Sequence, residues 1–157
     1  MSIELSLAVQ YGTPADELPR WRLRRWVRHA LDTLARTPGP HCRALRLTLR
    51  LADERETREL NHSYRERDYA TNVLTFEYGE DPEGVTAADV VLCVPVLRRE
   101  AAEQQKPLLH HAAHLTVHGV LHALGHDHIE TADAHRMETL ETAILEKLGI
   151  PDPYRVS

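Results

Sequence analysis

The sequence predicts an α+β (mixed α/β) fold: a single domain in which a mixed sheet of about four strands packs with about five helices. The chain has 157 residues, of which 42% are hydrophobic and 27% charged, and this suits one globular domain. Some segments alternate apolar and polar side chains, as strands do, whereas others repeat apolar residues every three or four positions, as helices do. Because the two kinds of segment are interspersed, both contribute to one layered domain.

The N-terminal part of the chain predicts two strands and two helices. Residues 3–9 alternate apolar and polar side chains, as in a strand buried on one face. Residues 18–36 carry an apolar stripe at helical spacing, and a Pro-Gly-Pro sequence ends that helix. Residues 45–51 alternate leucine with arginine or threonine and form the clearest strand. Residues 53–64 predict a helix, because the acidic residue at its start is followed three positions later by Glu56, a capping-box pattern.

The rest of the chain predicts two strands and three helices. Residues 73–78 alternate again and predict a strand, and residues 79–86 predict a polar loop. Residues 89–94 are almost all apolar, as expected of a strand covered on both faces. Further apolar stripes bounded by proline or glycine predict helices over residues 95–105, 107–124 and 131–148.

Composition argues against several classes of protein. The longest apolar run, residues 90–97, is far shorter than the roughly 20 residues that cross a membrane, so no membrane partner is expected. The start of the chain lacks a basic segment followed by an apolar one, so no secretory signal is expected. The two cysteines, Cys42 and Cys93, form no C-x-x-C pair, which favours a reducing compartment over a disulfide framework.

Charge is unevenly distributed along the chain. The net charge of −5 argues weakly against a nucleic-acid partner. However, residues 1–50 carry nine arginines against four acidic residues, whereas residues 51–157 carry ten basic against twenty acidic residues. A protein with two oppositely charged faces can still bind a polyanion on one of them.

Histidines carry the strongest functional signal. Eight of the eleven lie within residues 110–135. His118 and His122 are four apart in a predicted helix, so their side chains share one face about 5–6 Å apart and can reach one ion. Gly125 ends that helix, and His128 follows where the chain can return it as a third ligand. Three imidazoles with an open fourth position favour catalytic zinc, with nickel, copper and cobalt as alternatives.

Residues next to the three histidines indicate which reactions the predicted metal site could catalyse. Zinc proteases place glutamate, their general base, directly after the first histidine, and this chain has Gly119 there. That glycine either lets a substrate approach the metal or lies under a packed neighbour. We expect His114, on the same helix face, to support the site as a buried, hydrogen-bonded group. Asp127 either orients a ligand or caps the turn.

Two separated segments resemble the YbeY endoribonucleases, a family also described as ribosomal RNA maturation factors. The family's metal motif is roughly His-Gly-x-Leu-His-Leu-x-Gly-Tyr-Asp-His, and residues 118–128 resemble it. Its second motif is roughly Leu-Asn-x-x-(Tyr/Trp)-Arg-x-x-Asp-x-Pro-Thr-(Asp/Asn)-Val-Leu-Ser-Phe, and residues 60–76 resemble it. The departures from the two motifs are Ala123, His126, Ala70 and Thr75.

The resemblance implies a function for the chain. It implies a single metal-dependent endoribonuclease domain over residues 1–157, with a three-histidine zinc site, in a cytoplasmic bacterial protein. Its substrate would be single-stranded RNA, namely the ribosomal RNA precursor. Its role would be to mature the 3′ end of the small-subunit RNA and to act in ribosome quality control, with the small ribosomal subunit as partner. The metal would activate water or polarise the phosphate.

Arg65 is the candidate catalytic residue that the second motif implies. Phosphodiester cleavage concentrates negative charge on the phosphoryl oxygens, and a guanidinium meets that charge with two parallel hydrogen bonds. The alternative is a solvated arginine at a helix end that forms a salt bridge with Glu66 or Asp68.

Arginines of the predicted helix 18–36 and strand 45–51 suggest a surface that binds RNA. Those that we expect to contact it are Arg22, Arg25, Arg46 and Arg50. Trp21 and Trp26 could stack on bases. The alternative is a solvated helix whose tryptophans pack inward.

Two other functions fit parts of the sequence. The chain could be a non-enzymatic ribosome assembly factor with a structural metal, in which case variants of the ligands would unfold it. It could also be a metalloprotease similar to the metzincins, which share the spacing H-x₃-H-x₂-G-x₂-H. Gly119 in place of the general base disfavours the protease.

Overall fold

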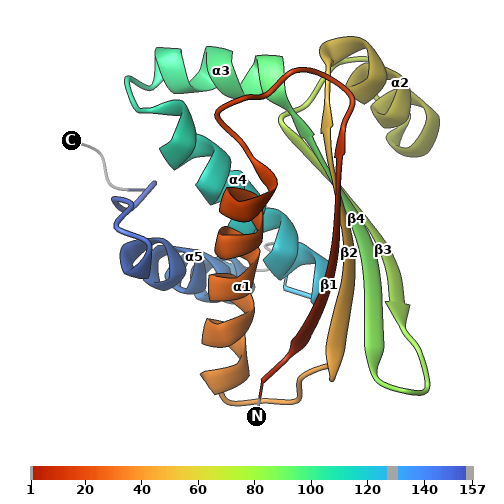
Figure 1. Ribbon diagram of the computed structural model, residues 1–157, viewed down its shortest axis with the longest axis vertical. Helices are drawn as coiled ribbons and strands as arrows, with labels where there is room; N and C mark the ends of the chain where they lie inside the picture. Colours follow the sequence, from red (N-terminus) through yellow and green to blue (C-terminus); the bar gives the residue numbers. More distant parts are fainter. Residues whose placement is uncertain (1, 127–130, 155–157) are drawn as a thin grey trace.

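A four-stranded sheet lies against a layer of helices in the computed structural model, which describes residues 2–126 and 131–154 (Figure 1). The strands are β1 (Glu4–Tyr11), β2 (Ala44–Ala52), β3 (Val73–Glu80) and β4 (Val85–Cys93), and their order in the sheet is β1-β2-β4-β3. β2 runs parallel to both β1 and β4, whereas β3 runs antiparallel to β4. The predicted mixed sheet is therefore confirmed.

Five helices connect and cover the strands in the described part of the chain. They are α1 (Arg20–Arg36), α2 (Glu54–Arg65), α3 (Val94–Glu103), α4 (Leu108–Ala123) and α5 (Thr131–Lys147). In Figure 1, α1, α4 and α5 lie on one side of the sheet, and α2 lies beyond the strands at one end. Each corresponds to a helix that the sequence predicts, α2 from its capping-box pattern and the others from their apolar stripes. None of these helices has an apolar stretch long enough to cross a membrane.

The main core fills the space between the sheet and the helical layer. β2 contributes four side chains to it that are almost fully buried: Leu45, Leu47, Leu49 and Leu51. Each such burial contributes about 1.5–3 kcal/mol. A smaller cluster of Ala52, Leu74 and Val91 lies on the opposite face of the sheet, where Leu60 of α2 packs against it. β4 is thus covered on both faces over part of its length, as its apolar sequence predicts.

The hairpin of β3 and β4 extends further than the sequence predicts. β3 continues to Glu80 and β4 begins at Val85, so half of the predicted loop over residues 79–86 belongs to the two strands. Only residues 81–84 form the turn. Backbone hydrogen bonds continue the pairing of β3 with β4 beyond the core. The side chains there are exposed, so apolar and polar residues do not alternate in a way that predicts a strand.

Gly119 lies at the point where α4 packs on β4. It is buried, and a Cβ atom placed on it would lie 2.7 Å from Cγ1 of Val90 and 3.1 Å from Cγ2. The helix approaches the strand this closely because the residue has no side chain. Of the two roles considered for Gly119, the structure therefore supports close packing, and not the approach of a substrate to a metal.

Replacing Gly119 with alanine should lower the free energy of unfolding by up to about 2 kcal/mol. Alanine gains about 1 kcal/mol of helix propensity, but overpacking a core costs about 1–3 kcal/mol. Denaturant unfolding of Gly119→Ala in the wild-type and Val90→Ala backgrounds measures the clash. In the Val90→Ala background, where the methyl groups are gone, the same substitution should be neutral or stabilising. A Gly119→Ala variant more stable than wild type would contradict the packing explanation.

Candidate metal centre

Four histidines follow one another along one face of α4: His111, His114, His118 and His122. In that order, successive ring centroids are 6.4, 6.3 and 5.4 Å apart. A carboxylate lies within 4.0 Å of each ring. These carboxylates are Glu100 for His111, Glu141 for His114 and His118, and Glu77 for His122. The histidine face of α4 is therefore lined with acidic partners from three other elements.

The structure brings together two of the three predicted metal ligands. The rings of His118 and His122 are the closest of these histidine neighbours and lie on one face of the helix, as their spacing predicts. The helix also ends as predicted, because Gly125 has a φ of 93°, in the left-handed region that glycine adopts readily. The third predicted ligand, His128, and the predicted supporting residue Asp127 lie outside the described residues.

Glu141 of α5 is a functional candidate that the sequence analysis missed. Its side chain is fully buried, and it accepts hydrogen bonds from Nε2 of His114 at 2.7 Å, Nδ1 of His118 at 2.9 Å and the hydroxyl of Tyr154 at 2.6 Å. The sequence does hold a signal, because Glu141 lies four residues after Met137 and three before Ile144, in the buried stripe of α5. A carboxylate in an apolar stripe requires buried donors.

The hydrogen bonds to Glu141 determine its charge. Burial by itself would raise the pKa of this carboxyl group, because it penalises the charged form. The hydrogen bonds from His114, His118 and Tyr154 outweigh that effect and lower the pKa to about 2. Burial and the same carboxylate raise the pKa of Tyr154. Glu141 is therefore an ionised, buried acceptor at neutral pH.

His114, His118 and Glu141 together form a cluster that could hold a metal ion. One ligand atom of each lies within 4.8 Å of the others. Imidazole and carboxylate are both common ligands of zinc. His118 belongs to this cluster and also to the predicted set of three histidines, so the two sets share one candidate ligand on α4. The bond from His114 to Glu141 also fits the hydrogen-bonded, supporting role that we expect of His114, whose side chain is partly buried.

Arg65 faces the same site from α2. It lines a hollow of about 430 Å³ together with His118, His122, Asn61 and other residues of α2, β3 and the segment between them. Its Nη2 donates a 2.7 Å hydrogen bond to the backbone oxygen of Thr75, which fixes the guanidinium against β3. The second motif and the histidine motif, far apart in sequence, therefore meet at one hollow.

Asp68, one of the two acidic residues considered as partners of Arg65, forms its salt bridge with another arginine. Arg58 donates to both carboxylate oxygens of Asp68, at 2.7 and 3.0 Å. Among the described residues, no carboxylate lies within 4.0 Å of the Arg65 guanidinium. Its charge is thus not neutralised by an ion pair at this position.

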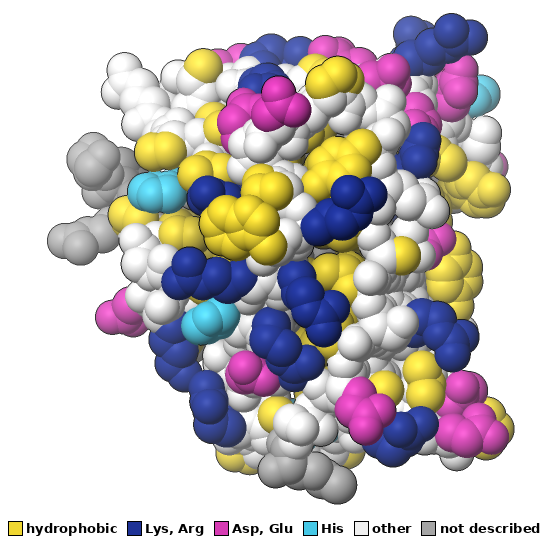
Figure 2. Space-filling model, in the orientation of Figure 1, with side chains coloured by type: hydrophobic (Ala, Val, Ile, Leu, Met, Phe, Trp, Pro, Cys, Tyr) yellow, Lys and Arg dark blue, Asp and Glu magenta, His cyan; other side chains and the backbone are white. Residues whose placement is uncertain are grey.

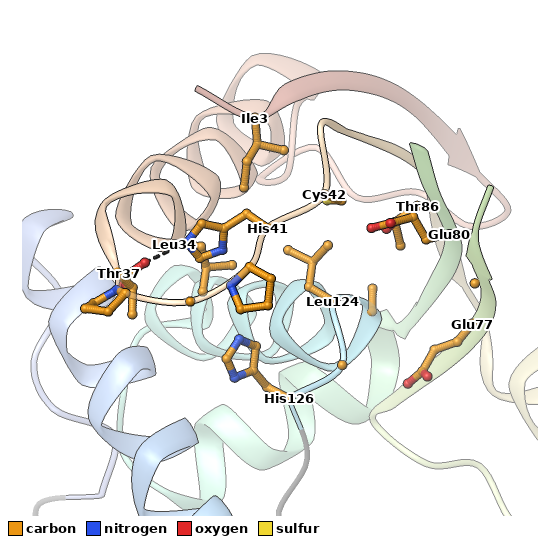
Figure 3. Close-up of a pocket in the computed structure, with 16 residues that line it drawn as sticks. Ile3, Leu34, Thr37, His41, Cys42, Glu77, Glu80, Thr86, Leu124 and His126 are labelled. Atoms are coloured by element: carbon orange, nitrogen blue, oxygen red, sulfur yellow. Dashed lines mark hydrogen bonds between the residues drawn. The ribbon is translucent and has the colours of Figure 1, made fainter. Parts of the chain in front are cut away.

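A second, larger hollow adjoins the end of α4. It has a volume of about 800 Å³, and Figure 3 shows His41, Leu124 and His126 on one side of it and Glu77, Glu80 and Thr86 on the other. Glu77 also lines the hollow that contains Arg65 and the two histidines. The surface around the candidate site is therefore recessed on both sides of Glu77.

The four arginines predicted to contact RNA do not form one surface. Arg22 and Arg25 belong to α1, over which Lys and Arg side chains gather in Figure 2. Arg46 and Arg50 alternate with the leucines of β2, which face the helices, so these two arginines point to the opposite side of the sheet. Arg50 is also paired with Glu56.

The two tryptophans of α1 differ in exposure. Trp26 is buried in the core, so it does not stack on bases, whereas the side chain of Trp21 is exposed. The interpretation of tryptophans packed inward is therefore right for Trp26 alone.

Fold and site together define a single-domain α+β protein whose central helix carries a histidine cluster able to bind a metal, beside a hollow lined by an arginine. The chain belongs to the YbeY family, because the family model described as Endoribonuclease YbeY matches residues 10–149.

Curated relatives named Endoribonuclease YbeY are similar over nearly the whole chain. The relative from Bordetella petrii is 65% identical over 154 residues, covering 98% of this chain and 99% of the relative. The relative from Bordetella pertussis is 60% identical, covering 98% of both chains. The relative from Thiobacillus denitrificans is 52% identical over 155 residues.

A solved structure shows the same fold. The solution structure of a Thermotoga maritima protein matches with a TM-score of 0.58 and 19% sequence identity, covering 96% of this chain and 100% of that one. At this level of identity the likeness concerns the fold alone.

Proposed function

We propose that the protein is a metal-dependent endoribonuclease, specific for single strands, that matures the 3′ end of the small-subunit ribosomal RNA and acts in ribosome quality control. The observation that carries this proposal is the hollow in which Arg65 of α2 meets His118 and His122 of α4. A cation and metal-binding imidazoles at one recess suit the cleavage of a phosphodiester. The names of the relatives support the same activity. Its place of action would be the bacterial cytoplasm, on the precursor RNA of the small ribosomal subunit.

We assign His118, His122 and His128 as the ligands of a single zinc ion. The first two share a helix face with ring centroids 5.4 Å apart. Glu141 already accepts three hydrogen bonds through its two oxygens, so we do not assign it as a ligand. An all-imidazole set suits zinc. When bound, such an ion lowers the pKa of water or polarises a phosphate oxygen.

Arg65 would hold the phosphate that is cleaved. One of its N–H groups is used by Thr75, and a guanidinium has several further donors that suit a phosphate. Its centre also lies 5.9 Å from the ring centroid of Phe76, which restricts its motion from a second side. A guanidinium fixed before the substrate arrives stabilises phosphoryl charge without reorganisation.

Exposed tyrosines around Arg65 offer stacking surfaces for a single strand. Tyr64 and Tyr78 are 68% and 64% exposed, and both line a hollow of about 620 Å³ that also contains Arg65. Stacking of a base on an aromatic ring contributes about 1–3 kcal/mol and is available to unpaired bases. We therefore place the RNA over this face. Contacts from Arg46 would fall on the same side of the sheet, and those from Arg22 and Arg25 on the other.

Cleavage of matched RNAs tests the proposed function. The purified, zinc-loaded protein would be incubated with a single-stranded precursor that spans the 3′ end of the small-subunit RNA, and with the same RNA annealed to its complement. We expect cleavage of the single strand and little cleavage of the duplex. Binding without cleavage would support the non-enzymatic assembly factor instead, and equal cleavage of both RNAs would contradict the strand specificity.

A further inference from the structure

Glu141 connects three parts of the chain through one buried carboxylate. Its Oε1 accepts from Nδ1 of His118, and its Oε2 accepts from Nε2 of His114 and from the hydroxyl of Tyr154. α5 supplies the carboxylate, α4 the two histidines and the segment after α5 the tyrosine. No part of the reaction proposed above uses this group, although it contacts one of the proposed ligands directly.

The contact determines which nitrogen of His118 carries the proton. An ionised carboxylate only accepts hydrogen bonds, so the nitrogen that faces it must donate. The two oxygens of the buried Glu141 face two imidazole nitrogens and a hydroxyl, and its carboxylate accepts a hydrogen bond from each of these three groups. In a neutral imidazole with hydrogen on Nδ1, the lone pair is on Nε2, the nitrogen that a metal would bind. The chain thus selects the tautomer of His118 before any ion arrives.

The carboxylate near His122 contrasts with Glu141. Glu77 Oε1 lies 3.5 Å from Nδ1 of His122, and half of its side chain is exposed. That contact is longer than a normal hydrogen bond, and water competes for it. The carboxylate that His118 contacts is therefore buried, whereas the carboxylate near His122 lies at the surface.

We propose that Glu141 is a positioning residue for His118: its carboxylate accepts Nδ1–H, fixes the orientation of the ring and directs Nε2 toward the metal. The inference rests on the proposed function, which makes His118 and His122 ligands. Carboxylates that hold metal-binding histidines in this way typically strengthen metal affinity by about 10–100-fold.

Zinc affinity, measured on the full chain by competition with a coloured chelator, tests this role. Glu141→Gln keeps the shape of the side chain and removes its charge, and we expect it to weaken zinc binding by about 10–100-fold. Tyr154→Phe is the matched control, since it removes one donor to Glu141 without touching His118, and its affinity should stay close to wild type. Unchanged affinity in Glu141→Gln would overturn the proposal.

The zinc-free wild-type protein gives a second readout that needs no variant. In the NMR spectrum of the ¹⁵N-labelled imidazoles, His118 should show the tautomer with hydrogen on Nδ1. In Glu141→Gln, its signals should move toward a mixture of both tautomers, because a neutral amide is the weaker acceptor. Hydrogen on Nε2 in the wild type would overturn the proposal even if Glu141→Gln failed to fold.

Two histidine variants separate this inference from the proposed function. If Glu141 were itself a ligand together with His114 and His118, His114→Gln would lose zinc as fully as His118→Ala, and His122→Ala would keep it. We expect the reverse, with His122→Ala costing far more affinity than His114→Gln. Retention of zinc by His122→Ala would overturn the ligand assignment of the proposed function. Loss of zinc in His122→Ala with unchanged affinity in Glu141→Gln would overturn the positioning role alone.

Discussion

Replacing His122 with alanine should abolish metal binding and RNA cleavage and leave the fold intact. His122 lies in the last turns of α4 with its side chain partly exposed, so alanine there creates no cavity in the core and favours the helix. The proposed ion loses one of three imidazoles. Because a metal contributes several kcal/mol to the stabilisation of a transition state, the cleavage rate should fall by about 10³-fold or more.

Elemental mass spectrometry, circular dichroism and a cleavage assay on one preparation measure these effects. His110→Ala, at the other end of the same helix, is the matched control and should keep both metal and activity. Full cleavage by His122→Ala would contradict the catalytic role of the site. An unfolded variant would instead indicate a structural metal, as in the assembly factor.

Replacing Arg65 with alanine should remove cleavage while the metal stays bound. The guanidinium lines the hollow of the histidines, and its hydrogen bond goes to the backbone of Thr75 in β3. Loss of one preorganised donor to developing charge typically costs about 10²–10³-fold in rate. The lost hydrogen bond to Thr75 should lower the free energy of unfolding by only about 0.5–1.5 kcal/mol.

Two further variants separate charge from geometry in this result. Arg65→Lys keeps the charge without the planar fork, so its activity should lie between those of wild type and Arg65→Ala. Arg55→Ala removes an exposed arginine of the same helix and should be as active as wild type. Full activity of Arg65→Ala with normal metal content would exclude Arg65 from catalysis.

Most of the fold follows from local patterns in the sequence. The leucines of β2 and the apolar stripes of α1 and α5 are strong periodic signals, and the side chains that make them are buried. The N-cap of α2 is equally local, because Asp53 accepts the hydrogen bond from the backbone N–H of Glu56 that the capping-box pattern predicts. Such elements are predictable since their period and caps lie within a few residues of one another.

The features of the site that could not be predicted from the sequence depend on contacts between distant segments. Glu141 meets His118 across 23 residues, and this requires the packing of α5 on α4. Arg22 and Arg46 were grouped together because each belongs to a basic segment. The two arginines point to opposite sides because α1 packs on the face of β2 that carries the leucines. No local pattern in the sequence shows which face α1 covers. The histidines of the proposed site could be found from their spacing, whereas the carboxylate of Glu141 that contacts His118 could not.

The most direct test of the central claim is the cleavage of single-stranded ribosomal RNA precursor by the wild-type protein before chelation, after chelation and after zinc is returned. We predict about one zinc per chain in the active protein, loss of cleavage when the zinc is removed and its recovery when zinc is restored. Cleavage that survives removal of the metal, or a zinc-loaded protein that leaves the RNA intact, would contradict a metal-dependent endoribonuclease.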